Sequence, residues 1–493
     1  MNINWRLIFM MLVIFLTLEI LSFGAVFYLP IFIILVALTA VLTAYRLEYG
    51  LLAVLAELLV GSMGHLFYLD VGAGRVPLRI GMFAAFFGVF LLFFVFQLIK
   101  ERSRSPYWLA WRNFPGRRIY SWLAGFVTLS LCIALLRGND LSFIFKDFNA
   151  WLYFALVFPA VAVYGQTDQG KWSRLQAVFL AGAVWLSLKT LFILFIFAHN
   201  TEVAAAIYYW LRRILGGEVT MVTAGWPRVF IQGQIFSAIA FFLAFWLGLS
   251  DRRERGFLKA DNLLNLGLCA LFFSTVLISL SRSFWVGLAV AVMFSGLALW
   301  RLKGVKSAVA AAGRLLVVGV LGFFLVYLVV IIPYNEDPAL SLGESLVNRV
   351  ASENEPALAS RWSLLPVLGA EIRQDPIFGR GFGATVAYTS SDPRVLSVHP
   401  DGRYTTYAFE WGYLDLWLKL GLFGLGTYLL LIFTLIKGAW HRTMESGDFL
   451  YLGLAAGLVF LGATNFFTPY LNHPLGIGCV VLGSCLILAN KVY

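Results

Sequence analysis

Two arginines lie at breaks between long apolar runs, where a positive charge needs a specific partner. Arg282 stands in the sequence Leu-Ser-Arg-Ser-Phe-Trp with almost no loop around it, and Arg228 follows a Trp-Pro pair at the start of another run. A guanidinium there is costly to desolvate unless it meets an anion or extends to the membrane surface. Its planar fork suits phosphate oxygens. Both residues are therefore candidates for a phosphate clamp, and the alternative is an arginine that contacts lipid headgroups.

A helix start is predicted at Arg228, because Pro227 is suited to the first turn of a helix. The backbone N–H groups exposed at a helix N-terminus favour anions, and an adjacent arginine strengthens that preference. Arg212 and Arg213 fall in the same predicted loop and are weaker candidates for the same role. An ordinary capped span with an interfacial arginine is the alternative.

A glycine-rich segment is the second candidate for anion binding. Residues 375–383 read Asp-Pro-Ile-Phe-Gly-Arg-Gly-Phe-Gly and include Arg380, and an Arg361-Trp362 pair precedes them. Three glycines within five residues indicate a sharp turn or a close backbone approach. Such a turn beside arginines can cradle a phosphate. It can equally be a tight turn that covers the helices.

Glu410 and His399 are the candidate proton acceptors. Glu410 directly precedes an apolar run, where desolvation of a carboxylate can make it a general base. The alternative for Glu410 is an ion pair with a nearby arginine. His399 lies in a polar turn flanked by proline, where we expect it to be exposed, although it could supply an imidazole to the site.

Three of the charged residues that fall inside predicted spans need a partner. Asp415 and Lys419 are four residues apart, which is the spacing of an ion pair on one helix. Lys189 has no comparable partner nearby in the sequence.

These residues must be positioned by membrane-spanning helices. The chain has 493 residues, a mean hydropathy of +0.83, 60% hydrophobic residues and 13% charged residues, which is too apolar for a soluble protein of this length. Apolar runs of about twenty residues recur, long enough to cross a bilayer core of about 30 Å. The sequence predicts an all-α polytopic membrane protein of about fourteen transmembrane helices. They are expected at 7–22, 25–44, 50–68, 79–99, 119–136, 150–164, 175–198, 229–249, 262–280, 283–299, 315–332, 412–436, 449–466 and 474–489.

The distribution of charge predicts the orientation of these spans. Lysines and arginines are dense in the short loops 100–118, 250–261 and 300–314, which together with both tails are assigned to the cytoplasm. The net charge of +11 therefore fits membrane topology better than a nucleic-acid partner. A long polar segment, 333–411, is assigned to the opposite, periplasmic side. It is a large loop within a single domain that spans 1–493, and its segments 340–350 and 361–372 have the spacing of amphipathic surface helices.

Several classes of chemistry have no support in the sequence. The four cysteines all lie in apolar runs and are typical of buried core residues. Metal-ligand spacings, a phosphate-binding Walker loop and a Gly-x-Ser-x-Gly elbow are absent from the sequence. This argues against ATP use and against metallohydrolase or serine-hydrolase chemistry, and no cofactor is expected.

The order of these features resembles the O-antigen ligase and O-antigen polymerase superfamily of bacterial envelope proteins. The resemblance covers roughly 220–436 and rests on Arg228, the Ser-x-Ser-Arg-Ser break at 279–283, the long outer loop and the segment that begins at Tyr413. Weaker support comes from 137–139 and Asp147.

The resemblance implies a C-type membrane glycosyltransferase of the inner membrane, independent of metal and nucleotide. Its donor would be a glycan on undecaprenyl pyrophosphate, and its acceptor a saccharide or lipid-linked hydroxyl at the periplasmic face. Arg228 and Arg282 would bind the pyrophosphate, Arg361 and Arg380 would shape the donor or acceptor site, and Glu410 would be the base.

The chain departs from the ligase pattern at one position. Ligases usually carry a His-Asn pair whose histidine lies three residues before the Tyr-Leu of the following span, where this chain has Glu410 and Trp411. This favours a polymerase, or a ligase with a different acceptor. The rival class is a multi-span transporter or flippase of a lipid-linked or anionic substrate, which would bury its polar groups near the bilayer midplane.

Overall fold

The computed structural model describes residues 4–24, 27–72, 74–101, 105–165, 168–221, 226–250, 260–333, 356–391 and 393–488, and it confirms the predicted all-α polytopic architecture. Within these ranges, ten helical segments are long and apolar enough to cross a membrane. They are α1 (Trp5–Phe23), α2 (Tyr28–Tyr45), α4 (Leu78–Glu101), α6 (Arg117–Leu136), the continuous α7 (Leu141–Trp151), η2 (Leu152–Leu156) and α8 (Val157–Tyr164), α9 (Gln169–Ala198), α12 (Ala260–Ser279), α13 (Arg282–Lys303), α14 (Val305–Ile331) and α18 (Gly412–Ser446).

Shorter helices occupy the remaining predicted spans. They are α3 (Leu47–Val60), α11 (Gln234–Ser250), α19 (Phe449–Asn465) and α20 (Pro474–Leu488). The remaining helices in the described ranges are α5 (Pro106–Asn113), α10 (Ala204–Trp210), η3 (Leu211–Leu215), α16 (Pro356–Gln374) and α17 (Pro393–Leu396).

Three antiparallel hairpins interrupt the helices and correct two predicted boundaries. The expected span 50–68 ends at Val60, because Ser62 and Gly64 have positive φ and the chain then enters β1 (Tyr68–Val71) and β2 (Gly74–Pro77). The expected span 229–249 begins only at Gln234. The residues before it form β4 (Pro227–Phe230), which pairs with β3 (Glu218–Met221).

The third hairpin lies in the long loop and consists of β5 (Val386–Thr389) and β6 (Arg403–Thr406). With α16 it forms a small layer with its own apolar core, in which Leu364, Leu368 and Ile372 pack on α18 and on Trp411. A helix covers 361–372, as predicted, and its apolar residues pack against protein. Its position along the membrane surface stays a prediction. The other predicted amphipathic segment, 340–350, lies outside the described residues.

The main core is built around α19, which packs against α11, α13 and α18. Small residues allow this close packing: a Cβ on Gly453 would lie 2.9 Å from the Phe242 carbonyl oxygen, and one on Gly287 would lie 3.0 Å from that of Phe460. Glycines at such contacts let membrane helices approach closely and gain van der Waals energy. The elements that carry the candidate site therefore rest on a tightly packed centre.

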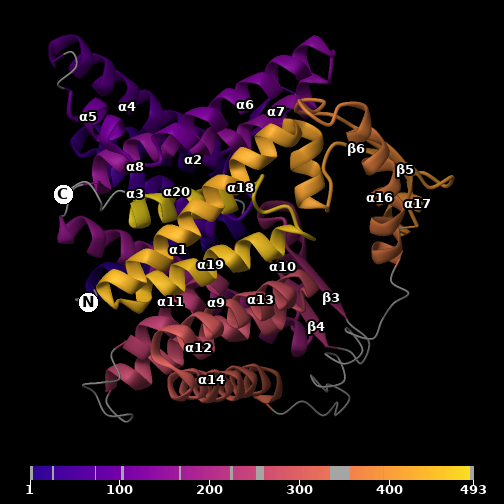
Figure 1. The fold of residues 1–493 in the computed structure, drawn as a ribbon. Coiled ribbons are helices and arrows are strands. Elements are labelled where there is room, and N and C mark those ends of the chain that lie inside the picture. The colour runs from indigo at the N-terminus through magenta and orange to yellow at the C-terminus, as the bar shows by residue number, and fades with distance from the viewer. Residues whose placement is uncertain are drawn as a thin grey trace.

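The two ends of the helix bundle differ (Figure 1). Both termini lie at one end, and the β3–β4 hairpin, α16 and the β5–β6 hairpin lie at the other. The candidate arginines at 228, 282 and 361 are carried by elements at this second end.

Several charges are buried as pairs between helices. Lys189 Nζ lies 2.6 Å from Glu19 Oε1, which joins α9 to α1 and supplies the partner that was missing for Lys189. Arg79 Nε lies 2.8 Å from Glu57 Oε2, and both side chains are buried. Pairing makes such burial tolerable, since an isolated charge in this environment would be very costly.

Candidate functional site

Arg282 lies at a sharp junction between α12 and α13. It is the first residue of α13, and Leu280 just before it has a positive φ of 44°, which is unusual for a residue other than glycine. The junction is held by Arg228, whose Nε donates to the Ser279 carbonyl oxygen at 2.9 Å. The Ser-x-Ser-Arg-Ser break is thus a tight turn that brings Arg228 and Arg282 together.

Arg228 reaches this junction from a strand, and the predicted helix start at Pro227 is wrong. In the hairpin Arg228 is opposite Thr220, and its guanidinium lies over the Phe230 ring at 5.4 Å. Glu218, on the partner strand, is 4.0 Å from Arg212 Nη1. A hairpin competes successfully with the helix here because Val219 and Val229, a cross-strand pair of β-branched residues, are both buried.

Arg361 joins this pair from the long loop. Burial lowers the pKa of the Arg361 guanidinium, and the positive charges of Arg228 and Arg282 lower it further. Burial likewise lowers the pKa of Arg228; Arg282 adds to this effect and Glu218 opposes it. Three guanidinium groups from β4, α13 and α16 are therefore close enough to repel one another, and an anion bound among them would relieve that repulsion.

Glu410 belongs to the same cluster. Its carboxylate forms an ion pair with Arg361 Nε, which realises the alternative considered from the sequence. The Trp411 indole Nε1 donates to the Arg361 backbone carbonyl at 3.0 Å, so the chain around Glu410 is fixed to α16 at two points. The structure thus brings together four of the predicted site residues. We call the cluster of Arg228, Arg282, Arg361 and Glu410 the arginine site.

The first turn of α13 adds a second source of positive potential. Its N-cap residue Ser281 makes no side-chain capping bond to the helix in the part of the chain that the structure describes; its Oγ lies 2.9 Å from Ser283 Oγ instead. The first N–H groups of a helix have no partner within the helix, and the helix dipole favours negative charge at this end. The arginine site therefore lies at a helix terminus suited to phosphate.

The glycine-rich segment 375–383 docks onto the helices. Gly379, Gly381 and Gly383 all have positive φ, and a Cβ on any of them would lie within 2.7 Å of backbone atoms of α18, α6 or α7. The Arg380 amide donates to the Leu418 carbonyl at 2.6 Å, and the Gly383 amide donates to Asp147 Oδ2 at 2.7 Å. Because these amides are used internally, the geometry favours a tight turn covering the helices over a phosphate cradle.

Side chains of the α6–α7 region hold the same segment. Arg137 Nη2 lies 2.6 Å from Asp375 Oδ1, and Asn139 Nδ2 donates to the Phe382 carbonyl at 2.8 Å. These are the positions that gave weaker support to the resemblance, and the structure connects them to the glycine-rich turn. Arg380 forms an ion pair with Glu371, and burial together with the charge of Arg137 lowers the pKa of Arg380.

A break in α18 receives this segment. Gly421 has φ 70° and ψ 178° inside the helix, and a Cβ there would lie 2.1 Å from the Ile377 carbonyl oxygen. Beside the break, Lys419 Nζ lies 2.7 Å from Asp415 Oδ1, as the i,i+4 spacing predicts, and 2.8 Å from Asp147 Oδ1. Lys419 and Asp415 are 4% and 1% exposed, so this is a buried charged cluster that ties α18 to α7 and to the docked turn.

Replacing Gly381 with alanine is expected to destabilise the protein. The new Cβ would lie 2.5 Å from the Ala134 amide nitrogen at a φ of 80°, so steric overlap and backbone strain add up to about 2–4 kcal/mol. Thermal unfolding in detergent measures the change. Gly369→Ala is the control, because no atom of the described residues lies within 4 Å of the Cβ position at Gly369 in α16. This change should stabilise the helix by about 0.5–1 kcal/mol. Equal unfolding temperatures for the two variants would contradict the docking.

Replacing Lys419 with methionine is expected to cost about 3–5 kcal/mol, because it leaves Asp147 and Asp415 as buried carboxylates without their shared cation. The same unfolding measurement applies. Lys437→Met changes an exposed lysine of the same helix and should have little effect. If both variants unfold alike, the cluster does not hold α18 to α7.

The other predicted site residues lie outside the arginine site. Arg212 and Arg213 are exposed on η3. His399 is exposed in the turn after α17, where its amide donates to the Val395 carbonyl at 2.7 Å. Their predicted roles in substrate binding stay predictions.

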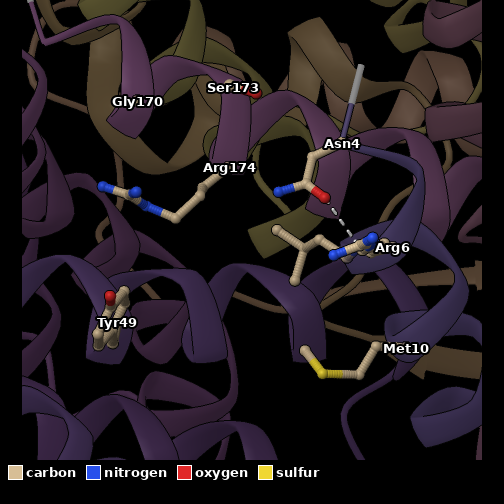
Figure 2. A pocket seen from close by; sticks show the side chains of 8 residues that line it. Asn4, Arg6, Met10, Tyr49, Gly170, Ser173 and Arg174 are labelled. Carbon is tan, nitrogen blue, oxygen red and sulfur yellow. Dashed lines mark hydrogen bonds between the residues drawn. The ribbon is translucent and has the colours of Figure 1, made fainter. Parts of the chain in front are cut away.

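A pocket of about 550 Å³ lies near the start of the chain (Figure 2). It opens between the beginnings of α1 and α9 and is lined in part by Arg6, Tyr49 and Arg174. Arg174 Nε and Nη2 already donate to Glu48 Oε1 and Oε2, at 2.7 and 2.9 Å. The pocket is at the first turn of α9, whereas Val229, next to Arg228, is linked through Gln234 to Thr190 in the second half of that helix. The twenty residues from Gly170 to Thr190 span about 30 Å, so the pocket is not part of the arginine site.

One comparison with known proteins gives a family match. Residues 267–429 match the family model described as O-antigen ligase. The match includes Arg282, Arg361 and Glu410, and it ends within α18. No curated protein matches the chain, and no solved structure does.

Proposed function

We propose a function for this chain from its membership of the O-antigen ligase and O-antigen polymerase superfamily. It transfers a glycan from an undecaprenyl-pyrophosphate donor to a saccharide hydroxyl. The reaction would take place at the periplasmic face of the inner membrane during assembly of lipopolysaccharide or exopolysaccharide. The observation that carries the proposal is the convergence of Arg228, Arg282 and Arg361 at the start of α13, with Glu410 paired to Arg361.

The chemistry of the transfer accounts for each of these groups. The acceptor oxygen forms a bond to the anomeric carbon of the donor sugar, and the bond from that carbon to the pyrophosphate oxygen breaks. Negative charge grows on the leaving pyrophosphate, where Arg228, Arg282 and the first turn of α13 stabilise it. The proton of the acceptor hydroxyl passes to the Glu410 carboxylate.

Arg361 links the two halves of this reaction. Its guanidinium lies within electrostatic reach of the other two arginines and also contacts Glu410. A pyrophosphate bound to the arginines would therefore lie near the proposed base, as a transfer between two bound substrates requires.

The transporter alternative draws on the buried charges and on the broken helix α18. Transporters commonly use broken helices to line a substrate cavity with unpaired backbone groups. Here Gly379 packs into the break at Gly421, and the Leu418 carbonyl accepts a hydrogen bond from the Arg380 amide. The Lys419 carbonyl accepts one from Ser130 Oγ at 2.9 Å. A break that is packed in this way supports a rigid scaffold, so we favour the transferase.

Reconstitution tests the proposal directly. The full chain in lipid nanodiscs is mixed with an undecaprenyl-pyrophosphate oligosaccharide donor and a saccharide acceptor, and the acceptor's mass and released undecaprenyl pyrophosphate are followed. We expect both to increase together, including in the presence of a chelator. Movement of the intact donor across the bilayer without release of undecaprenyl pyrophosphate would favour the transporter.

A further inference from the structure

Two tryptophans are the sequence neighbours of the Arg361–Glu410 ion pair, and Phe466 packs on one of them. Trp362 follows Arg361 in α16, and Trp411 follows Glu410. The ring of Trp411 lies 5.4 Å from that of Trp362 and 5.8 Å from that of Phe466, with interplanar angles of 62° and 82°. Two rings from distant parts of the chain are thus each held edge-on by one central indole.

The exposure of these rings differs. Trp411 is 7% exposed and packs in the core beneath α16, and its indole N–H is used by the Arg361 carbonyl. Trp362 is 55% exposed and Phe466 is 50% exposed. Most large apolar side chains that are exposed in this chain lie on the candidate membrane spans, where lipid would cover them. Trp362 lies on α16, which is not a candidate span, and Phe466 lies just past the end of α19. Both rings are therefore available to a ligand beside the ion pair.

The same rings are close to the other half of the arginine site. Phe466 caps α19, and Thr468 just after it donates to Ser283 Oγ at 2.9 Å. Ser283 directly follows Arg282. The aromatic surface therefore extends from the Arg361–Glu410 pair toward the start of α13, where the pyrophosphate is proposed to bind.

We propose that Trp362 and Phe466, supported by Trp411, form a platform on which a sugar ring of the substrate stacks during transfer. The inference rests on the proposed function and deepens it, because it assigns a saccharide subsite next to the phosphate site. Sugar rings present C–H groups on their faces, which pack on aromatic rings, and hydroxyls at their edges, which need polar partners.

The neighbouring charges favour a saccharide over the lipid chain of the donor. The side chains of Arg361 and Glu410 are 37% and 52% exposed at the edge of the platform, and they can donate to and accept from hydroxyl groups. A polyprenyl chain on the same rings would remove the water that is hydrogen-bonded to that ion pair, and it has no polar groups that could take the place of this water. A sugar replaces them.

Saturation-transfer NMR on the full chain in nanodiscs tests the platform without requiring turnover. The probes are lipid-free oligosaccharides released by mild acid from the envelope polysaccharide of the source bacterium, and undecaprenyl phosphate. We expect saturation to pass from aromatic protons to sugar-ring protons. Affinity for the oligosaccharides should fall by about fivefold in Trp362→Ala and in Phe466→Ala, and most of it should remain in Trp362→Phe, because phenylalanine keeps an aromatic face.

Trp122→Ala is the matched control, because Trp122 is 57% exposed on α6; it should bind the oligosaccharides like the wild type. Unchanged oligosaccharide binding in Trp362→Ala and Phe466→Ala would overturn the proposal. If these two variants weaken only the binding of undecaprenyl phosphate, the rings bind the lipid and the proposal is also overturned. The test is separable from the proposed function. Arg282→Ala should lose transfer while it still binds the free oligosaccharide. A wild type that binds it through Trp362 yet transfers no glycan would refute only the function.

Discussion

Replacing Arg282 with alanine is expected to lower the rate of glycan transfer by about 10²–10³-fold, the usual cost of removing one group that stabilises charge in a transition state. Arg282 lies at the first position of α13, beside Arg228 and within electrostatic reach of Arg361. Its positive charge therefore acts where the leaving pyrophosphate is proposed to gain negative charge. Initial rates measured in nanodiscs at saturating donor would give the change in kcat.

Two further variants separate charge from geometry. Arg282→Lys keeps the charge and loses the planar fork, so an intermediate rate is expected. Arg373→Ala removes an exposed arginine from the last turn of α16 and should leave the rate unchanged. All variants should be recovered from the membrane in similar amounts. If both Arg282→Ala and Arg228→Ala keep full activity, the arginines do not bind the pyrophosphate.

Hydropathy was sufficient to predict the helices but not the hairpin that carries Arg228. Runs of about twenty apolar residues have few alternatives in a membrane, because every backbone polar group must be satisfied within the segment. Near Arg228 the residues Val229, Phe230 and Ile231 continue the apolar run, so the sequence alone gives no boundary. The start of the helix is set by the pairing of β4 with β3, which precedes it in the sequence. A hydropathy pattern within the apolar run does not contain this information.

Local spacing likewise identified one buried pair and missed its neighbours. Asp415 and Lys419 share a helix turn and were predictable, whereas Asp147 contacts Lys419 from another helix 272 positions away. Lys189 is paired with Glu19, 170 positions away. Glu19 and Lys189 each lie in a predicted span with no other charged residue, and neither charge is stable there alone. That pattern could have predicted that the two are paired.

The residues of the arginine site were grouped from the sequence by residue type, by predicted side of the membrane and by the resemblance to the ligase and polymerase superfamily, so residues far apart in the chain could be considered together. That reasoning placed Arg228, Arg282 and Glu410 together, and the structure adds Arg361 as the contact between them. It could not separate Arg361 from Arg380, because both are loop arginines beside glycine or tryptophan. Only packing shows that Arg380 belongs to the docked turn, where Glu371 is its partner.

Replacing Glu410 with glutamine is expected to lower kcat by about 10²–10⁴-fold, because glutamine cannot accept the proton of the acceptor hydroxyl. The change is nearly isosteric, but it also removes the ion pair with Arg361, so the rate alone does not separate a base from a positioning group. The pH profile does. If Glu410 is the base, kcat of the wild type falls in acid as the carboxylate is protonated, and this acidic limb disappears in Glu410→Gln while the donor KM changes little. If Glu410 only orients Arg361, the limb persists and the donor KM rises.

His399→Ala is the control for the base. It should match the wild type, because His399 is exposed in the turn after α17. Loss of the acidic limb in that variant would instead identify the imidazole as the base and leave Glu410 as the partner of Arg361.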